Sequence, residues 1–363
     1  MSITELIDDY SYILVKISAA KAKMVSYEQM MKLIESRDMS EFKNILSNIE
    51  QDISPSLINS SKDLEKSFHG IFFDYLETLI KNSPRECQEF LLKYLQKYEL
   101  ENLKDLVVGK LIGIDANTIR ERIFLKVEDI LHTTEIIEDA IKMDSLKEVI
   151  FLYRKTQYHE LLHELESRYE ATGELFFIYA LLDRFYIQDF NNLLHEHAKW
   201  RSIEKKIARF FIGTLTDSYN LNIVLRGINH DFQWGEIELL LVDGKHAYVI
   251  GEDKLQDLYK IGKNKDEIFK KVKNYLENYT YSQKALKVLK KSMLIHSIRT
   301  FYHNLTIAYF NTLKFKSGHE LSEVIAFMIR KEVEIDNLVT IMEGVKNNYD
   351  RDKLKKYLIK EVV

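Results

Sequence analysis

The most regular feature of this sequence is the spacing of its apolar residues, which recur three and four positions apart along most of the chain. This period places apolar side chains on one face of an α-helix, whereas a half-buried strand would alternate every second residue. Two prolines and twelve glycines in 363 residues leave few turn residues for a strand-rich fold. The pattern therefore predicts an all-α protein. One stretch with this spacing contains Phe68, Ile71, Phe72, Tyr75, Leu76 and Leu79.

A short box occurs three times along the chain: Asn-Leu, five further residues, and then Gly. The starts of the boxes are 118 and 117 residues apart, so the period is nearly constant. Within each box the apolar residues fall on one helical face. We therefore expect each box to end a helix, with its Gly in a left-handed cap. The three boxes are Asn102–Gly109, Asn220–Gly227 and Asn337–Gly344.

A longer stretch repeats in step with the box. The sequence from Ser26 aligns without gaps with that from Thr133, 107 residues later, and a third copy begins at Gly251. Ser26 and Thr133 each precede an apolar-periodic run with an early acidic residue, which is typical of a helix N-cap. A fixed long period indicates one helical unit copied in tandem. We predict three similar helical units, at residues 1–112, 113–230 and 231–363.

Two details of this arrangement can be tested in a structure. Asp243-Gly244 lies between two apolar runs within residues 238–250, which would suit a β-hairpin. We favour a helix end followed by a turn, because the corresponding segment after the first box is predicted to be helical. The N-terminal helix has no Asn-Leu box before it, and the last box has no partner after it. Closing three units into a ring would bring these ends together, so we expect adjacent termini.

The distribution of charge narrows the class of partner. The formal net charge is −4, with −8 over residues 1–228 and +4 over residues 229–363. An acidic total argues against a nucleic-acid-binding protein, which would have a basic face. Four lysines in the basic part are predicted to share one helix face, either as a solvated surface or as a docking surface for acidic groups. They are Lys284, Lys287, Lys290 and Lys291.

The cysteine count and the hydropathy indicate in which cellular compartment the protein is expected and whether it crosses a membrane. Cys87 is the single cysteine, so no internal disulfide can form, and a reducing compartment is expected. The opening residues are acidic rather than basic, unlike those of a signal peptide. No run of eighteen apolar residues occurs, so we expect no membrane span. Any association with a membrane would then pass through a partner or a surface.

Residues 159–163 spell HELLH, a literal H-E-x-x-H motif. On a helix this spacing places two imidazoles a turn apart, with the glutamate ready to activate a zinc-bound water. A catalytic zinc needs a third protein ligand, and no recognised extension after His163 supplies one. The chain also has no Gly-rich phosphate loop and no nucleophile motif. We therefore expect no catalytic residue, no metal and no cofactor, and a zinc hydrolase is the least favoured alternative.

Three stretches together resemble one protein family. Residues 10–26, YSYILVKISAAKAKMVS, are similar to the opening of the C subunit of archaeal-type ATP synthases, the counterpart of the d subunit of the eukaryotic vacuolar proton pump. The second box, residues 220–227, resembles that family's N-L-x-x-x-L-R-G. Residues 330–344 resemble its K-E-x-E-x-x-N-L-x-x-I-x-x-G. The likeness covers nearly the whole chain, although the family's usual Arg-x-Arg in the opening helix is replaced here by Lys16 and Ser18.

The resemblance implies a fold and a role. The expected body is all-helical and funnel-shaped, with three lobes related by pseudo-threefold symmetry. Such a subunit is a non-catalytic part of the central stalk of a rotary A/V-type ATPase, present in one copy per complex. It stands peripherally on the cytoplasmic face of the membrane, on the ring of proteolipid subunits, with the foot of the axle subunits in its hollow. It transmits torque between ion flow and ATP synthesis or hydrolysis, and it binds no nucleic acid.

A few charged residues remain candidates for partner contacts. Lys16 keeps a positive charge in the opening helix but lacks the planar guanidinium of arginine. Arg226, just before the Gly of the second box, either favours the helix dipole or contacts the axle. Lys331 and Glu334 are predicted to form a local surface pair. The alternative function is a free-standing helical-repeat scaffold that binds another protein on its concave face.

Overall fold

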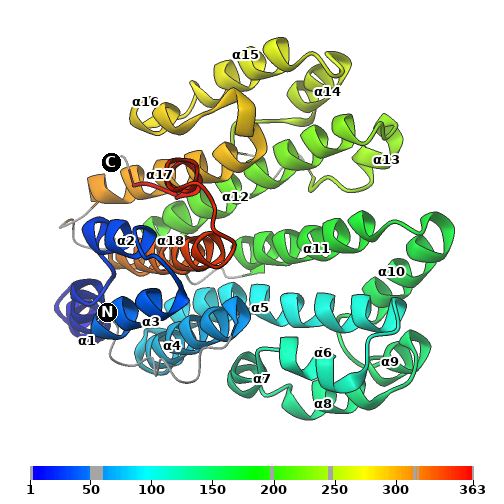
Figure 1. Cartoon of the computed structure of the whole chain (residues 1–363), viewed down its shortest axis with the longest axis horizontal. Helices are drawn as coiled ribbons and strands as arrows, with labels where there is room; N and C mark the ends of the chain where they lie inside the picture. The colour runs from blue at the N-terminus through cyan, green and yellow to red at the C-terminus, as the bar shows by residue number, and fades with distance from the viewer. Residues whose placement is uncertain are drawn as a thin grey trace. The chain divides into compact units, whose positions relative to one another are not determined.

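The computed structural model describes residues 3–49, 60–196, 200–243, 248–313, 316 and 319–361, without the side chains of residues 3–9, 61, 195 and 196. Within these ranges the regular structure is helical and contains no strand (Figure 1). The all-α prediction is confirmed. The described part of residues 238–250 holds the end of one helix and a turn, as favoured over a β-hairpin.

Six of the long helices come in three consecutive pairs of similar length. Each second member carries one Asn-Leu box near its C-terminal end. The pairs are α4 (Ser61–Asn82) with α5 (Arg85–Leu111), α11 (Leu175–Glu196) with α12 (Ser202–Asn229), and α17 (Leu294–Leu313) with α18 (Glu320–Lys346).

Short helices follow the same period. Three helical hairpins correspond to the stretches that begin at Ser26, Thr133 and Gly251: α2 (Tyr27–Ile34) with α3 (Met39–Ile49), α8 (Thr134–Lys142) with α9 (Leu146–Leu152), and α14 (Glu252–Lys260) with α15 (Lys265–Leu276). The other helices are α1 (Ile3–Ala22), α6 (Ala116–Arg122), α7 (Leu125–Leu131), α10 (His159–Thr172), α13 (Trp234–Glu238), α16 (Ser282–Ala285) and α19 (Arg351–Tyr357).

The hairpins bury equivalent side chains, as the alignment of the repeats predicts. Ile34 and Ile141 are buried at matching positions, and so are Phe42 and Val149. The hydroxyl of Ser26 accepts a hydrogen bond from the backbone N–H of Gln29, so its N-cap role is confirmed. Thr133 occupies the N-cap position of α8, but its side chain makes no capping bond there. Its hydroxyl donates instead to a nearby carboxylate, Glu128.

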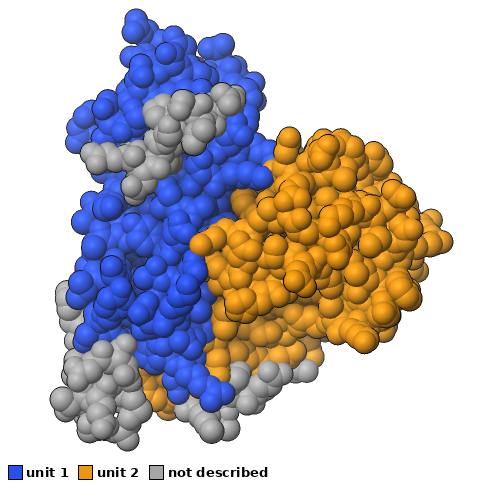
Figure 2. All heavy atoms as spheres, turned by 90° about the horizontal axis from the view of Figure 1, so that it is seen from below, with its two compact units in different colours: residues 1–88, 303–363 blue, residues 89–302 orange. Residues whose placement is uncertain are grey.

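The chain divides into two compact units, coloured separately in Figure 2. Unit 1 comprises residues 1–88 and 303–363, and α18 is its central helix, in contact with α1, α2, α3, α4 and α19. Phe327 of α18 is fully buried, and the ring of Tyr75 meets it edge-on with centroids 5.9 Å apart. Helix α19 also packs against α2. The two ends of the chain therefore belong to one unit, as closure of the repeat predicts.

Unit 2 comprises residues 89–302. Its core includes an aromatic cluster in which Phe90 lies 5.1 Å from Phe190 and 5.8 Å from Phe211, centroid to centroid. Helix α11 packs against α10 and α12, and α12 also contacts α14. Helices α11 and α12 thus pack against each other and also against shorter helices. The three-lobe boundaries at residues 112/113 and 230/231 remain a prediction.

Candidate functional site

The asparagine of each box binds the backbone of a residue 22 positions later. In each case the side-chain oxygen accepts the N–H of that residue, and the side-chain amide donates to its C=O. The N–H···O distances are 2.7 Å for Phe124 on Asn102, 2.9 Å for Val242 on Asn220 and 2.8 Å for Ile359 on Asn337. The return bonds measure 3.2, 2.9 and 2.9 Å in the same order. We call these pairs clamps 1, 2 and 3.

The glycine of each box is a packing position, so the prediction of a left-handed cap there was wrong. A Cβ on Gly227 would lie 2.5 Å from a side-chain carbon of Ile237, and Gly109 and Gly344 are equally crowded by the residue ten positions later. The left-handed residue comes four positions after the glycine, at Gly113, Asp231 and Asn348. The next N–H then bonds back to the glycine carbonyl at 2.8, 3.0 and 2.8 Å.

An acidic residue stands three positions before each clamp asparagine, a regularity that the sequence analysis missed although all three boxes show it. Asp217 is fully buried and accepts the N–H groups of Tyr248 and Val249, at 3.1 and 2.8 Å, and the hydroxyl of Tyr279. Burial raises its pKa to about 6 despite these donors. Burial likewise raises the pKa of Glu99 to about 7.

The third acid, Glu334, corrects one sequence prediction. Lys331 and Glu334 do pair locally, with Nζ and Oε2 2.5 Å apart, but both side chains are buried rather than on the surface. The other carboxylate oxygen of Glu334 accepts the N–H of Val25, just before the N-cap of α2, at 2.5 Å. The helical spacing predicted the pair but could not show that a distant segment covers it. Glu99, which is half-buried, accepts a hydrogen bond from the hydroxyl of Tyr158. Each acid thus ties a box to another segment of its unit.

We use the word joint for a clamp together with the hairpin beside it. Joint 1 joins clamp 1 to α8–α9, joint 2 joins clamp 2 to α14–α15, and joint 3 joins clamp 3 to α2–α3. In joints 1 and 2 the residue bound by the asparagine precedes the N-cap of the hairpin by nine positions. Phe124 precedes Thr133 in joint 1, and Val242 precedes Gly251 in joint 2. In joint 3 the hairpin comes from the opposite end of the sequence. Joint 3 is therefore held by non-covalent contacts alone.

Several polar contacts hold joint 3. The Nζ of Lys355 lies 2.9 Å from a carboxylate oxygen of Glu35, and Arg351 donates to the carbonyl of Ser36 at 2.7 Å. The ammonium of Lys360 stands 5.2 Å from the ring centroid of Tyr27. These contacts place the C-terminal segment against α2.

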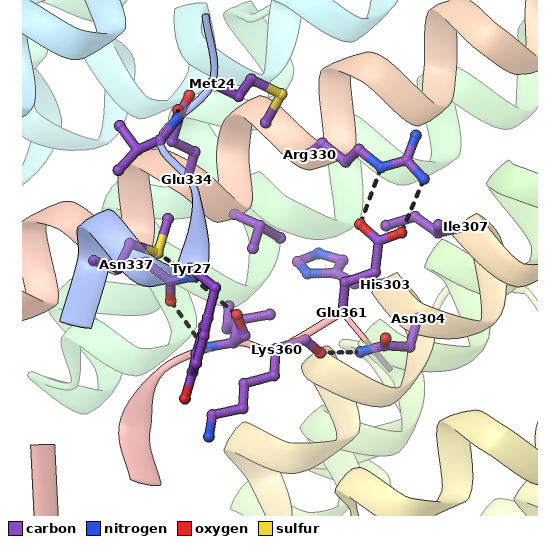
Figure 3. A pocket seen from close by; sticks show the side chains of 14 residues that line it. Met24, Tyr27, His303, Asn304, Ile307, Arg330, Glu334, Asn337, Lys360 and Glu361 are labelled. Carbon is purple, nitrogen blue, oxygen red and sulfur yellow. Dashed lines mark hydrogen bonds and ion pairs between the residues drawn. The ribbon is translucent and has the colours of Figure 1, made fainter. Parts of the chain in front are cut away.

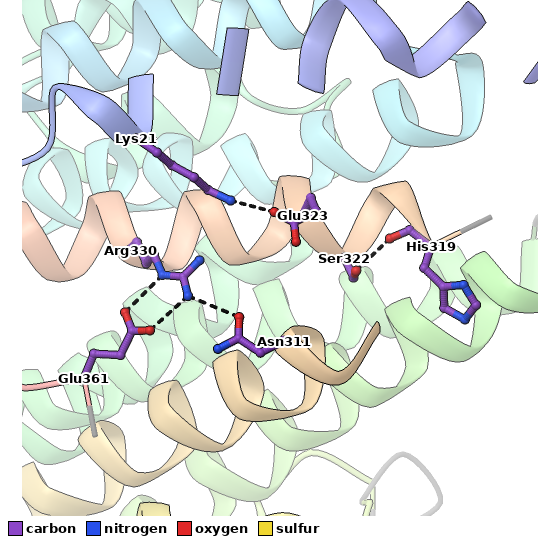
Figure 4. A network of polar contacts seen from close by, with 7 residues as sticks. All are labelled: Lys21, Asn311, His319, Ser322, Glu323, Arg330 and Glu361. Atoms are coloured by element: carbon purple, nitrogen blue, oxygen red, sulfur yellow. Dashed lines mark hydrogen bonds and ion pairs between the residues drawn. The ribbon is translucent and has the colours of Figure 1, made fainter. Parts of the chain in front are cut away.

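Further contacts of unit 1 tie Glu361 to the long helix α18. The guanidinium of Arg330 binds both carboxylate oxygens of Glu361, at 2.9 and 3.0 Å, and also reaches Asn311 (Figure 4). Lys21 of α1 pairs with Glu323 of the same helix at 2.6 Å. Beside the first of these pairs lies a cavity of about 530 Å³, lined by α2, α17, α18 and residues 359–361 (Figure 3).

Two of the predicted partner residues lie on long helices with their side chains exposed. Lys16 projects from α1 with its ammonium 5.4 Å from the ring centroid of Tyr12. Arg226 is exposed in the last turn of α12, one residue before the crowded Gly227. A cation there interacts favourably with the helix dipole. Exposure leaves both side chains accessible to a partner.

The four predicted lysines are exposed but do not form a stripe on one helix face. Helix α16 has only four residues, and two 3-10 turns, Leu286–Val288 and Lys291–Met293, follow it. The chain becomes extended at Leu289 and Lys290, where the Ser297 hydroxyl accepts the N–H of Lys290 at 3.2 Å. Lys291 pairs with Asp266. The four lysines therefore lie along an irregular segment, residues 284–291, which we call the basic segment.

The HELLH motif begins helix α10. The rings of His159 and His163 lie 4.7 Å apart, with Leu161 and Leu162 buried in the core. Among the described residues, no group of three or more His, Cys, Asp and Glu side chains is placed to hold a metal ion. Leu161 and Leu162, between the two histidines, are packing residues of α10. Nor is any helix in the described ranges long and apolar enough to cross a membrane.

Comparisons with known proteins agree along most of the chain. The family model of the ATP synthase (C/AC39) subunit matches residues 13–357. The A-type ATP synthase C subunit of Methanocaldococcus jannaschii is 22% identical over 367 residues, covering 98% of this chain and 88% of that protein. The same subunit of Methanothermobacter thermautotrophicus is 27% identical over 336 residues, covering 92% and 83%. That of Methanobrevibacter smithii is 23% identical over 362 residues, covering 98% and 89%.

Proposed function

Because this chain belongs to the ATP synthase (C/AC39) subunit family, a non-catalytic component of the complex, we propose that it is the rotor subunit between axle and ring. In this role it stands on the cytoplasmic face of the membrane as a peripheral protein, one copy per complex. It holds the foot of the axle subunits and rests on the proteolipid ring. Its three helical units are arranged as a funnel with pseudo-threefold symmetry. The observation that carries the proposal is the family match over residues 13–357.

The joints support a mechanical role. A subunit that transmits torque must not shear internally, so its segments need fixed connections rather than flexible linkers. In each joint two hydrogen bonds from a buried asparagine fix the backbone after the box, and a crowded glycine brings the next short helix close. The acid three positions before the asparagine, buried in joints 2 and 3 and half-buried in joint 1, adds a further connection. Repeating this device three times distributes the load along the chain.

Charged surface residues are the proposed partner contacts. The basic segment, with Lys284, Lys287, Lys290 and Lys291, would meet carboxylates of the ring loops or lipid headgroups. Such contacts are individually weak, so many of them are needed. Lys16 and Arg226 are proposed as further partner contacts, Arg226 toward the axle. All of these contacts would be binding contacts without a catalytic role, as expected of a subunit that couples two others.

Affinity purification tests the proposal. The tagged chain is expressed at its native level and recovered from membranes in mild detergent, with an untagged strain as control. We expect the proteolipid ring, the axle subunits and the ATP-hydrolysing head to co-purify in constant ratio. Recovery of the chain with an unrelated protein and no ATPase subunit would contradict the proposal and favour the free-standing scaffold.

A further inference from the structure

The acids that stand three positions before the clamp asparagines are held by different donors. Asp217 of joint 2 accepts the backbone N–H groups of Tyr248 and Val249, three and two positions before the N-cap of α14. Glu334 of joint 3 accepts the N–H of Val25, one position before the N-cap of α2. In both joints the acid therefore binds the backbone of the segment that leads into the hairpin.

In joint 1 the segment that leads into the hairpin has no backbone donor left for the acid, because it is helical. Helix α7 extends to Leu131, so the residues of its last turn donate within the helix. The N–H groups of His132 and Thr133 turn back to carbonyls of the same helix, at 3.3 and 2.9 Å. Among the described residues no backbone group donates to the carboxylate of Glu99, and its one hydrogen bond comes from a tyrosine.

The carboxylate of Glu99 is thus only partly satisfied. The Tyr158 hydroxyl donates to its Oε2 and accepts a hydrogen bond from Nε2 of Gln96 at 3.0 Å. Its Oε1 has no donor in the described part of the chain. Lys93, six positions earlier on α5, pairs with Asp189 and not with Glu99. A half-buried carboxylate without a cation and with one unbound oxygen is a strong acceptor.

A cavity of about 360 Å³ lies beside this acid. Glu99 lines it together with Leu131 and Thr133, so the cavity lies where the acid and the leading segment do not meet. Leu92 of α5 and Leu193 of α11 add further apolar wall. The volume is within the range of small-molecule sites, whose walls combine apolar side chains with a few polar groups that orient the ligand.

We propose that this cavity binds a free, small alkylammonium compound, whose N–H groups donate to the unbound oxygen of Glu99. The ammonium group takes the role that backbone donors have in joints 2 and 3, and the alkyl chain packs against the leucines. A cation is favoured over a neutral donor, because a hydrogen bond between an ammonium group and a carboxylate is about twice as strong as a neutral one. The inference rests on the comparison of the three joints and does not require the rotor role.

A titration with n-butylammonium chloride tests the site, with n-butanol as an uncharged control of the same length. Binding to the isotope-labelled full chain is followed by NMR through the indole N–H of Trp200, which donates to Glu89 of the cavity wall at 3.1 Å. Because the chain has two tryptophans, Trp234→Phe identifies the signal. We expect a saturable shift with the amine and none with the alcohol.

Substitution of the acid should remove most of the affinity. Glu99→Gln should weaken binding of n-butylammonium at least about tenfold, because a charged acceptor is replaced by a neutral one. Glu164→Gln removes the same charge at an exposed position of α10 and should bind like the wild type. If circular dichroism shows that Glu99→Gln does not fold, Gln157→Lys replaces it. Gln157 is exposed and lines the cavity, so the new ammonium group should repel the probe.

The dependence of binding on pH gives a second readout on the unaltered chain. Burial raises the pKa of Glu99 to about 7, whereas an alkylammonium group stays charged from about pH 6 to about pH 8. The affinity should therefore rise about tenfold over this range, in step with the ionised fraction of the acid. The other titratable groups that face this carboxylate are Lys93, Glu128, Tyr153, Tyr158 and Asp189.

Three results would overturn the proposal. Equal binding of the amine and the alcohol would show that no charge is recognised. Undiminished affinity of Glu99→Gln, or of Gln157→Lys in its place, would show that the amine binds elsewhere. An affinity that stays constant from about pH 6 to about pH 8 would show that the carboxylate of Glu99 is not the acceptor.

Discussion

Single residues decide how closely the short helices approach the long ones. The glycines of the boxes were expected to serve as caps because Gly often ends a helix. Each lies instead within the last turns of a long helix, and the next short helix returns over it. The sequence could predict the box and its period, but not this role, since Ile237 lies ten residues away and crosses Gly227 only after the turn at Asp231.

The crowding at Gly227 leads to a stability prediction. Gly227→Ala should lower the free energy of unfolding by about 1–3 kcal/mol, because the new methyl group forces Ile237 out of its position. Urea unfolding followed by circular dichroism measures the loss. Gly235→Ala is the control, since no atom lies within 4 Å of its added Cβ. Adding Ile237→Ala to Gly227→Ala should cost less than the sum of the two single changes. Strict additivity would show that the two residues do not compete for space.

At the scale of elements, apolar periodicity was a good guide to the long helices and a poor one to the irregular segments between them. The hairpins α2–α3 and α8–α9 begin where the aligned repeats predicted. The basic segment was instead assumed to be one helix, because its lysines have helical spacing. The chain is instead extended at Leu289 and Lys290, where the Ser297 hydroxyl accepts the N–H of Lys290, and a contact of this kind leaves no periodic trace. Periodicity likewise could not reveal that the backbone of Val25, just before α2, binds Glu334 of the pair with Lys331.

The basic segment should bind through charge rather than shape. Replacing Lys284, Lys287, Lys290 and Lys291 together by Gln should weaken binding of the chain to purified proteolipid ring in lipid nanodiscs, most strongly at low salt. Binding is measured by sedimentation at several salt concentrations. A second quadruple variant neutralises exposed lysines elsewhere in the chain, Lys147, Lys155, Lys346 and Lys353, and should bind nearly as the wild type does. Equal binding of wild type and the first variant at every salt concentration would remove the segment from the interface.

The whole molecule is unusual in that one of its joints is assembled from opposite ends of the sequence. The box period predicted that the ends would meet, because the N-terminal helix has no box before it and the last box has no partner after it. What the period could not predict is the set of contacts that replaces the missing connection. The contacts of Glu361 with Arg330 and of Lys360 with Tyr27 belong to this joint. Unit 1 thus depends on its last described residues in a way that unit 2 does not.

Deleting residues 358–363 should therefore loosen unit 1 alone. The deletion removes both bonds of clamp 3 and leaves the Asn337 side chain buried without the Ile359 backbone, a loss of about 2–4 kcal/mol. Hydrogen exchange followed by mass spectrometry should show faster exchange in α2 and in the C-terminal half of α18, whereas α11 and α12 keep their protection. Deleting only residues 362–363 retains the clamp and should change little. If α2 stays protected after the larger deletion, the other contacts of α19 suffice to close the joint. If all helices lose protection equally, the two units unfold together and joint 3 holds the entire molecule.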